Sequence, residues 1–220
     1  MRKDTLYGQE YEASNLIPGE EHSETAVSME QLSVAYYVTA CVSHYLYRRS
    51  LGLLKLASAY VEKGYYQQAK NLCEHVYETM KRILGEEHPE TLTSLNNMAG
   101  AYNELEDYEE ARRLLEQAYQ SKKKVLGEYH PDTLIGLHNL GFSYYELGDH
   151  EEARRLLEQA YQGQKKVLGG GYPHTLISLH HLGLSYYKLG DHEEARRLYE
   201  QAYHGRKKAL GEDHPDTLTS

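Results

Sequence analysis

The sequence predicts an all-α protein, built as a solenoid of antiparallel helix pairs. Glycines recur at Gly85, Gly127, Gly169 and Gly211, so the chain repeats every 42 residues. Each unit contains two stretches with apolar residues at helical spacing, separated by a short polar turn. A fixed period with two helices per unit is typical of arrays in which neighbouring units share one continuous core.

The first helix of each unit is expected to begin at a proline. Pro89 suits the first helical turn, because the N–H that proline lacks would have no partner there. The histidine before it, His88, can accept a backbone hydrogen bond as a weak N-cap, as can His130 and His214 in other units. The apolar stripe of this helix consists of Leu95, Met98, Ala99 and Tyr102.

The second helix is expected over DYEEARRLLEQAYQSKKKVL, between Asp107 as N-cap and Gly127 as the C-terminal stop. Glu109 and Arg113 are spaced as an i, i+4 ion pair, and the later units repeat that spacing. The lysines before Gly127 favour the negative helix end and are read as a solvated surface. The inner stripe consists of Ala111, Leu114, Leu115, Ala118, Tyr119 and Val125.

These stripes resemble the packing signature of the tetratricopeptide repeat, and the phrase LGEYHPDTL from Leu126 resembles the extended repeats of kinesin light chains. The unit is longer than the family's usual repeat of about 34 residues. The resemblance covers residues 53–220 and implies a right-handed superhelix.

The domain organisation follows from the period. Residues 1–52 are expected to form a degenerate partial repeat or helical cap, with a relic of a second helix over 1–17 and a modified helix over 24–47. The predicted complete repeats span 53–88, 89–130, 131–172 and 173–214. Residues 215–220 are expected to start a truncated further helix.

Composition excludes several classes of partner. A formal net charge of −9 argues against a protein that follows a nucleic-acid backbone. No run of 18 apolar residues occurs, so membrane insertion is not expected. Cys41 and Cys73 lack zinc-type spacing, which favours a reducing, cytoplasmic compartment.

No motif for catalysis or cofactor binding occurs in the sequence. The common nucleophile, phosphate-loop and dinucleotide patterns are missing, and His150-Glu151 and His192-Glu193 lack the second histidine of a metalloprotease helix. We therefore expect no enzyme activity, no cofactor and no metal. His138, His180 and His181 could approach one another, but no carboxylate set accompanies them, so groove or packing roles are expected.

The face of each first helix opposite the apolar stripe is the candidate binding surface. The resemblance implies that this face forms the concave wall that receives peptides in tetratricopeptide proteins. The candidate residues are Asn96, Asn97, Asn103, Ile135, His138, Asn139, Phe142, Tyr145, Ile177, His180, His181, Leu184, Tyr187 and Lys188. Their apolar members either hold a partner or pack against the next repeat, and both alternatives stay open. Only Lys55 and Lys188 are basic on this face, so the family's carboxylate clamp is not expected.

The predicted function is a protein-protein interaction module, an adaptor or scaffold that binds a peptide or protein segment in this groove. Two alternatives remain. The chain could be the regulatory repeat arm of a larger signalling protein, such as a nucleotide-switch ATPase, that docks on its own partner domain. It could also self-associate through its C-terminal edge.

One turn departs from the repeat. In LGGGYPHTL, from Leu168, two further glycines follow Gly169, and tyrosine stands where the other copies have histidine before the proline. Glycine adds backbone entropy to the unfolded chain. We therefore expect this turn to be the softest joint between complete repeats.

Overall fold

The computed structural model describes the backbone of residues 21–211 and the side chains of residues 31–209 and Gly211. All regular structure in these residues is helical, with eight helices and no strand. The helices are α2 (Glu21–Glu62), α3 (Tyr66–Leu84), α4 (Pro89–Glu104), α5 (Tyr108–Leu126), α6 (Pro131–Glu146), α7 (His150–Val167), α8 (Pro173–Lys188) and α9 (His192–Leu210). The predicted all-α fold is confirmed.

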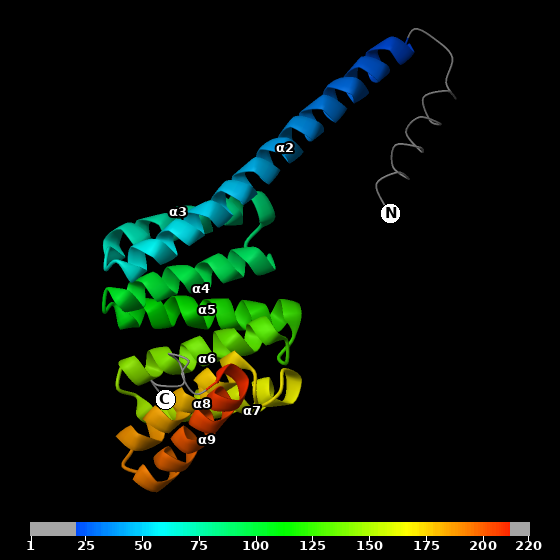
Figure 1. The fold of residues 1–220 in the computed structure, drawn as a ribbon. Coiled ribbons are helices and arrows are strands. Elements are labelled where there is room, and N and C mark those ends of the chain that lie inside the picture. The colour runs from blue at the N-terminus through cyan, green and yellow to red at the C-terminus, as the bar shows by residue number, and fades with distance from the viewer. Residues whose placement is uncertain (1–20, 212–220) are drawn as a thin grey trace. The chain divides into compact units, whose positions relative to one another are not determined.

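The chain divides into two compact units between Arg48 and Arg49. In the second unit, each helix from α3 to α9 packs on the next one along the sequence, and α6 also touches α8 (Figure 1). The end of α2 joins this stack, because Ala57 belongs to the same buried cluster as Ala69 and Leu95. This is the solenoid of antiparallel helix pairs that the period predicts.

Helix α2 is longer than the sequence pattern indicates. It runs without interruption through the boundary expected between residues 52 and 53. Its sequence contains no proline, and Gly52 is its only glycine, so no residue stops the helix. The expected helix over 24–47 is therefore the first part of α2, whereas the expected relic over 1–17 lies outside the described residues. Large apolar side chains on this part are exposed, including Tyr36 at 79%.

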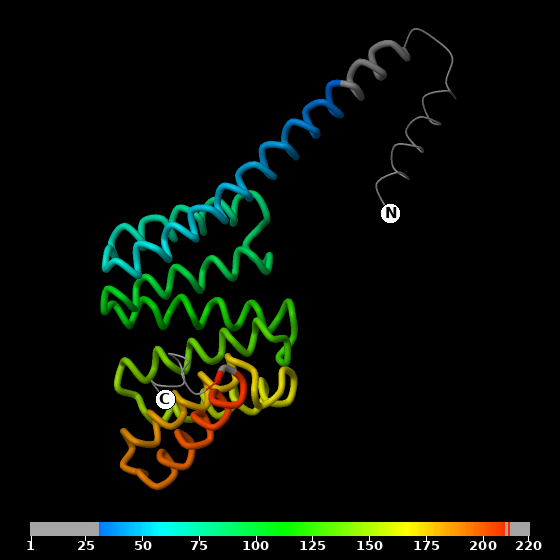
Figure 2. The backbone as a smooth tube through the Cα atoms, viewed as in Figure 1, coloured from blue at the N-terminus to red at the C-terminus, as the bar shows by residue number. Residues whose placement is uncertain are grey.

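The turn inside each helix pair has one residue in the left-handed region, where the chain reverses direction (Figure 2). Glycine occupies it at Gly64, Gly148 and Gly190, with φ between 76° and 87°. The equivalent residue of the second pair is Glu106, with φ of 59°. A non-glycine residue costs about 1 kcal/mol or more in this conformation.

The ends of the helices follow the sequence prediction in most repeats. His88 and His130 accept hydrogen bonds through Nδ1 from the second residue of α4 and α6, so the predicted histidine caps are confirmed there. His214 lies outside the described residues. Tyr172, before α8, provides no such cap. Gly127 ends α5 with φ of 92°, as predicted.

Two local predictions are wrong. Val125 is 41% exposed and does not join the inner stripe, because it lies in the last turn of α5, beyond the packed part of that helix. Arg113 pairs with Glu110 at i, i+3 and not with Glu109, which binds Arg112. The same shift of partner occurs in α7 and α9.

Candidate functional site

The first helices of three consecutive pairs surround a cavity of about 440 Å³, within the usual size range of ligand pockets. The end of α2, α4 and α6 provide most of its wall, with α3 and α5 behind them. The lining residues are Leu54, Ala57, Ser58, Val61, Cys73, Asn96, Asn97, Gly100, Ala101, Asn103, Glu104, Leu115, Asn139 and Phe142. The mixture of aliphatic and amide side chains suits a ligand with both apolar and hydrogen-bonding groups.

Carboxamides dominate the polar part of this wall. Asn96, Asn97 and Asn103 come from α4, and Asn139 comes from α6. The buried Oδ1 atoms of Asn96 and Asn103 have no hydrogen-bond donor in the described part of the protein. Buried polar atoms without partners are rare in folded proteins, so these two acceptors can receive N–H or O–H groups from a ligand.

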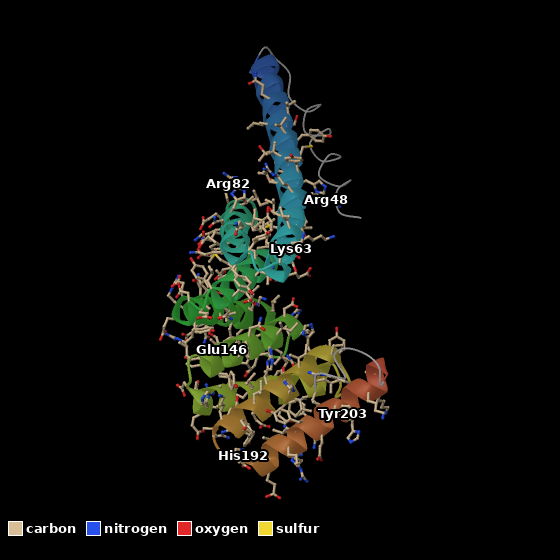
Figure 3. All side chains as sticks on the ribbon, turned by 60° about the vertical axis from the view of Figure 1, so that its left-hand side comes forward. Arg48, Lys63, Arg82, Glu146, His192 and Tyr203 are labelled. Carbon is tan, nitrogen blue, oxygen red and sulfur yellow. The ribbon has the colours of Figure 1, made fainter. Side chains whose placement is uncertain are left out.

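A second cavity, of about 320 Å³, lies beside the first and shares Asn103, Glu104 and Phe142 with it. It lies at the C-terminal ends of α4 and α6, where Figure 3 labels Glu146. Its remaining lining residues are Tyr66, Glu106, Tyr108 and Glu146. The two adjoining cavities are together called the α4–α6 groove.

Phe142, at the C-terminal wall of the α4–α6 groove, belongs to a stack of rings whose other members line neither cavity. Phe142 stacks on His181 with ring centroids 4.5 Å apart, and His181 stacks on His138 at 5.0 Å. Phe142 also stacks on Tyr145 at 6.0 Å. The stack joins α6 to α8, so Phe142 both lines the groove and holds two repeats together.

His138 is buried between repeats. Its Nδ1 lies 2.8 Å from Ser178 Oγ, and that hydroxyl donates to Gln164 Oε1 at 2.7 Å. Burial lowers the pKa of His138 to about 3, with a smaller contribution from the charge of His181. Burial, followed by the charges of His180 and Arg206, lowers the pKa of His181 to about 4. Both imidazoles are therefore neutral near pH 7.

The family model for the tetratricopeptide repeat matches residues 48–124, 96–166, 132–208 and 175–220. These overlapping matches span more than three quarters of the chain. The chain belongs to the tetratricopeptide repeat family. Members of this family are repeat scaffolds that bind other proteins, so this chain is a protein-interaction repeat scaffold.

Solved structures agree with this assignment. A Podosopora anserina protein, described as a kinesin light chain with nearly identical TPR-like repeats, is 35% identical, with a TM-score of 0.66 over 78% of this chain and 81% of that one. BtubC (BKLC) from P. vanneervenii is 19% identical, with a TM-score of 0.64 over 97% of this chain and 88% of that one, and supports the fold alone. No curated protein matches the sequence at a significant level.

The structure separates the sequence-predicted residues of this tetratricopeptide array into two groups. Asn96, Asn97, Asn103, Asn139 and Phe142 line the α4–α6 groove. The others line neither cavity: they are Ile135, His138, Tyr145, Ile177, His180, His181, Leu184, Tyr187 and Lys188.

Packing accounts for part of the second group. His138 is buried, and Ile135 and Leu184 are half-buried. Ile177 and Tyr187 are 36% and 54% exposed, so they remain open to a partner on α8. The expected groove therefore divides into a cavity-lined N-terminal part and a C-terminal part that is filled by its own side chains.

Sequence reasoning placed Glu104 and Glu146 on the groove face of the first helices, but it missed the α2 wall and three further residues at the acidic end of the groove. Leu54, Ser58 and Val61 precede Asn96, Gly100 and Asn103 by one period, so continuing the repeat backwards would have found them. Glu106 could have been noticed because it stands where the other units have the turn glycines Gly64, Gly148 and Gly190. Tyr66 and Tyr108 begin the second helices and gave no signal.

Two absences hold for the described residues. No group of three or more His, Cys, Asp or Glu side chains in residues 31–209 is placed to hold a metal ion. No helix within residues 21–211 is both long and apolar enough to cross a membrane.

Proposed function

We propose that the α4–α6 groove of this tetratricopeptide array binds a peptide segment of a partner protein, and that the chain acts as an adaptor or scaffold. The observation that carries the proposal is the cavity of about 440 Å³ lined by three consecutive first helices. A site of this kind holds a segment across repeat boundaries, so its shape depends on the order of the repeats.

The polar groups of the groove suit a peptide backbone. A carboxamide carries both donors and an acceptor, as a peptide bond does, so Asn97 and Asn139 can pair with main-chain groups of the ligand. The unpartnered Oδ1 atoms of Asn96 and Asn103 add two acceptors for ligand N–H groups. Leu54, Val61 and Phe142 supply apolar surface for its side chains. Polar contacts to the backbone combined with apolar contacts to the side chains are typical of grooves that bind peptides with moderate sequence preference.

The proposal concerns binding, and it assigns no catalytic residue or cofactor. The cytoplasmic compartment expected from the cysteine usage remains a prediction. The C-terminal surface around Tyr187 belongs to the proposal only as a place where a longer ligand would continue.

The test uses a random dodecamer peptide library displayed on phage and the full chain as bait. Enriched peptides are synthesised, and their affinities are measured by fluorescence anisotropy for the wild type and for an Asn97→Ala/Asn139→Ala variant. Loss of two hydrogen-bonding side chains should weaken binding about tenfold. A Gln120→Ala/Gln159→Ala variant is the matched control, because both glutamines are exposed on second helices.

Two results would overturn the proposal. The first is a failure to enrich any peptide. The second is a set of enriched peptides that bind the asparagine variant as tightly as the wild type.

A further inference from the structure

The α4–α6 groove has an unbalanced charge. Glu104, Glu106 and Glu146 all line its second cavity. No lysine, arginine or histidine lines either cavity in the described part of the chain. The acidic end of the groove therefore has no cation in its own wall.

These carboxylates also differ from other acids of the protein in their partners. Glu109 and Glu110, at the start of α5, form ion pairs with Arg112 and Arg113. Within the described residues, Glu104, Glu106 and Glu146 form no ion pair of this kind. Burial raises the pKa of Glu146, and the charge of Lys188 opposes that shift.

The carboxylates of Glu104, Glu106 and Glu146 all act on the same group, the hydroxyl of Tyr108. Burial is the main cause of the raised pKa of the Tyr108 hydroxyl, and Glu146, Glu106 and Glu104 raise it further. Tyr108 lines the same cavity as Tyr66 and Phe142, so aromatic rings adjoin the carboxylates. A ring face attracts a cation through its quadrupole, and a carboxylate attracts it through its charge.

A second observation concerns hydrogen bonding. The buried Oδ1 atoms of Asn96 and Asn103 lack donors, and Asn103 belongs to both cavities. Unpaired acceptors and carboxylates together favour a ligand with an excess of N–H donors. Arginine offers five such donors in a planar group that also stacks on aromatic rings.

We propose that the peptide segment held in this groove is basic, with an arginine side chain that lies among Glu104, Glu106 and Glu146. The inference rests on the proposed peptide-binding function and adds the chemical class of the partner. The guanidinium bonds to the carboxylates and lies against the rings of Tyr66, Tyr108 and Phe142, while the asparagines hold the backbone of the same segment. The net charge of −9 favours the approach of such a partner over an acidic one.

The experiment uses peptides selected from the random dodecamer library on the full chain. We expect arginine to be enriched at one position of the selected sequences. A selected peptide is then synthesised with that arginine and with citrulline, its uncharged isostere. Removal of the charge should weaken binding about tenfold.

The protein side is tested with a Glu104→Gln/Glu146→Gln variant, which keeps the shape of the side chains. It should bind the arginine peptide about as weakly as the wild type binds the citrulline peptide, and should discriminate little between the two. Glu78→Gln is the control, because Glu78 is exposed on α3 and lines neither cavity. Circular dichroism melting curves check that each variant folds.

The two proposals fail in different ways. If selected peptides depend on Asn97 and Asn139 but bind equally well with citrulline, peptide binding stands and the charge inference is overturned. If the selected peptides contain no basic residue, the charge inference is overturned as well. If no selected peptide depends on the asparagines, both proposals fall.

Discussion

Ser178 on α8 and His138 on α6 form a hydrogen bond across a repeat boundary, with 2.8 Å between Oγ and Nδ1. Gln164 Nε2 donates to the carbonyl oxygen of Leu134 at 3.3 Å, which leaves its Oε1 to accept from Ser178. A hydroxyl has one proton, so Ser178 must accept from His138. The neutral imidazole of His138 therefore carries its proton on Nδ1.

Replacing the central member of this network should destabilise the array. Ser178→Ala leaves the Nδ1–H of His138 and Oε1 of Gln164 without partners, at a cost of about 1–3 kcal/mol. Urea denaturation followed by circular dichroism measures the change. Ser185→Ala is the control, because among the described residues the Ser185 hydroxyl bonds only to the carbonyl oxygen of His181 in its own helix. Equal stabilities of the two variants would contradict the network.

The buried histidines should make stability depend on pH. Their pKa values, about 3 for His138 and about 4 for His181, lie below the ordinary 6.5, so the unfolded chain binds protons that the folded chain excludes. Above pH 6.5 the two histidines cause no loss in the free energy of unfolding. That free energy falls as the pH decreases from 6.5 towards their pKa values in the folded protein. The loss is about 1.4 kcal/mol per pH unit for each histidine.

The matched test is His138→Asn/His181→Asn, because one period earlier Asn96 stands in the place of His138 and Asn139 in the place of His181. The variant should lose much of the decline between pH 6.5 and 4.5, measured as the free energy of unfolding in urea. The window ends at 4.5 because the Arg155 hydrogen bond lowers the pKa of Glu152, which adds a loss of the same sign below that pH. His75→Asn removes an exposed histidine of α3 as a control. An unchanged slope in the double variant would refute this origin.

Glu106 is expected to lower the stability of its turn while it contributes to binding of the arginine peptide. Glu106→Gly removes a left-handed non-glycine residue, and the gain of about 1–2 kcal/mol is offset by about 0.5–1 kcal/mol of added chain entropy. We expect a small net stabilisation in thermal melts, together with weaker binding of the arginine peptide. The reverse change, Gly148→Glu, should destabilise the third repeat. A loss of stability in Glu106→Gly would show that the carboxylate supports the turn.

The LGGGYPHTL turn is expected to open more readily than its counterparts. α7 ends at Val167, one residue earlier than the period predicts, and Tyr172 provides no cap for α8. Amides of residues 169–172 should exchange faster with deuterium than those of 127–130. Tyr172→His restores the cap residue of the other repeats and should slow exchange, with a gain of about 0.5–1 kcal/mol. Equal exchange in the two turns would exclude a soft joint.

The period of the sequence predicts the helix pairs, because proline, Asx and glycine mark equivalent helix ends in most units. Pro89 begins α4 and Gly127 ends α5 as expected. The continuity of α2 through residue 52 was not predictable from the period, because the repeat pattern is degenerate there and suggested a boundary that the helix does not have. Local stop signals therefore predict where most helices end, and α2 continues because its sequence contains no such signal.

The candidate site was predictable only in part, because its residues depend on neighbouring repeats. Asn96 and His138 hold the same place in their helices, yet only Asn96 lines the groove. The two side chains have different neighbours in the next repeat. Gly136 lies beside Asn96, whereas Ser178 forms a hydrogen bond with His138. A single-helix pattern contains no information about that contact.

The most direct test of peptide binding in the groove is an NMR titration of the 15N-labelled full chain with a selected arginine peptide. The side-chain amide signals of Asn96, Asn97, Asn103 and Asn139 should shift together and saturate with the affinity measured by anisotropy. If these four signals stay in place while the peptide binds, the ligand site lies elsewhere and the account is wrong.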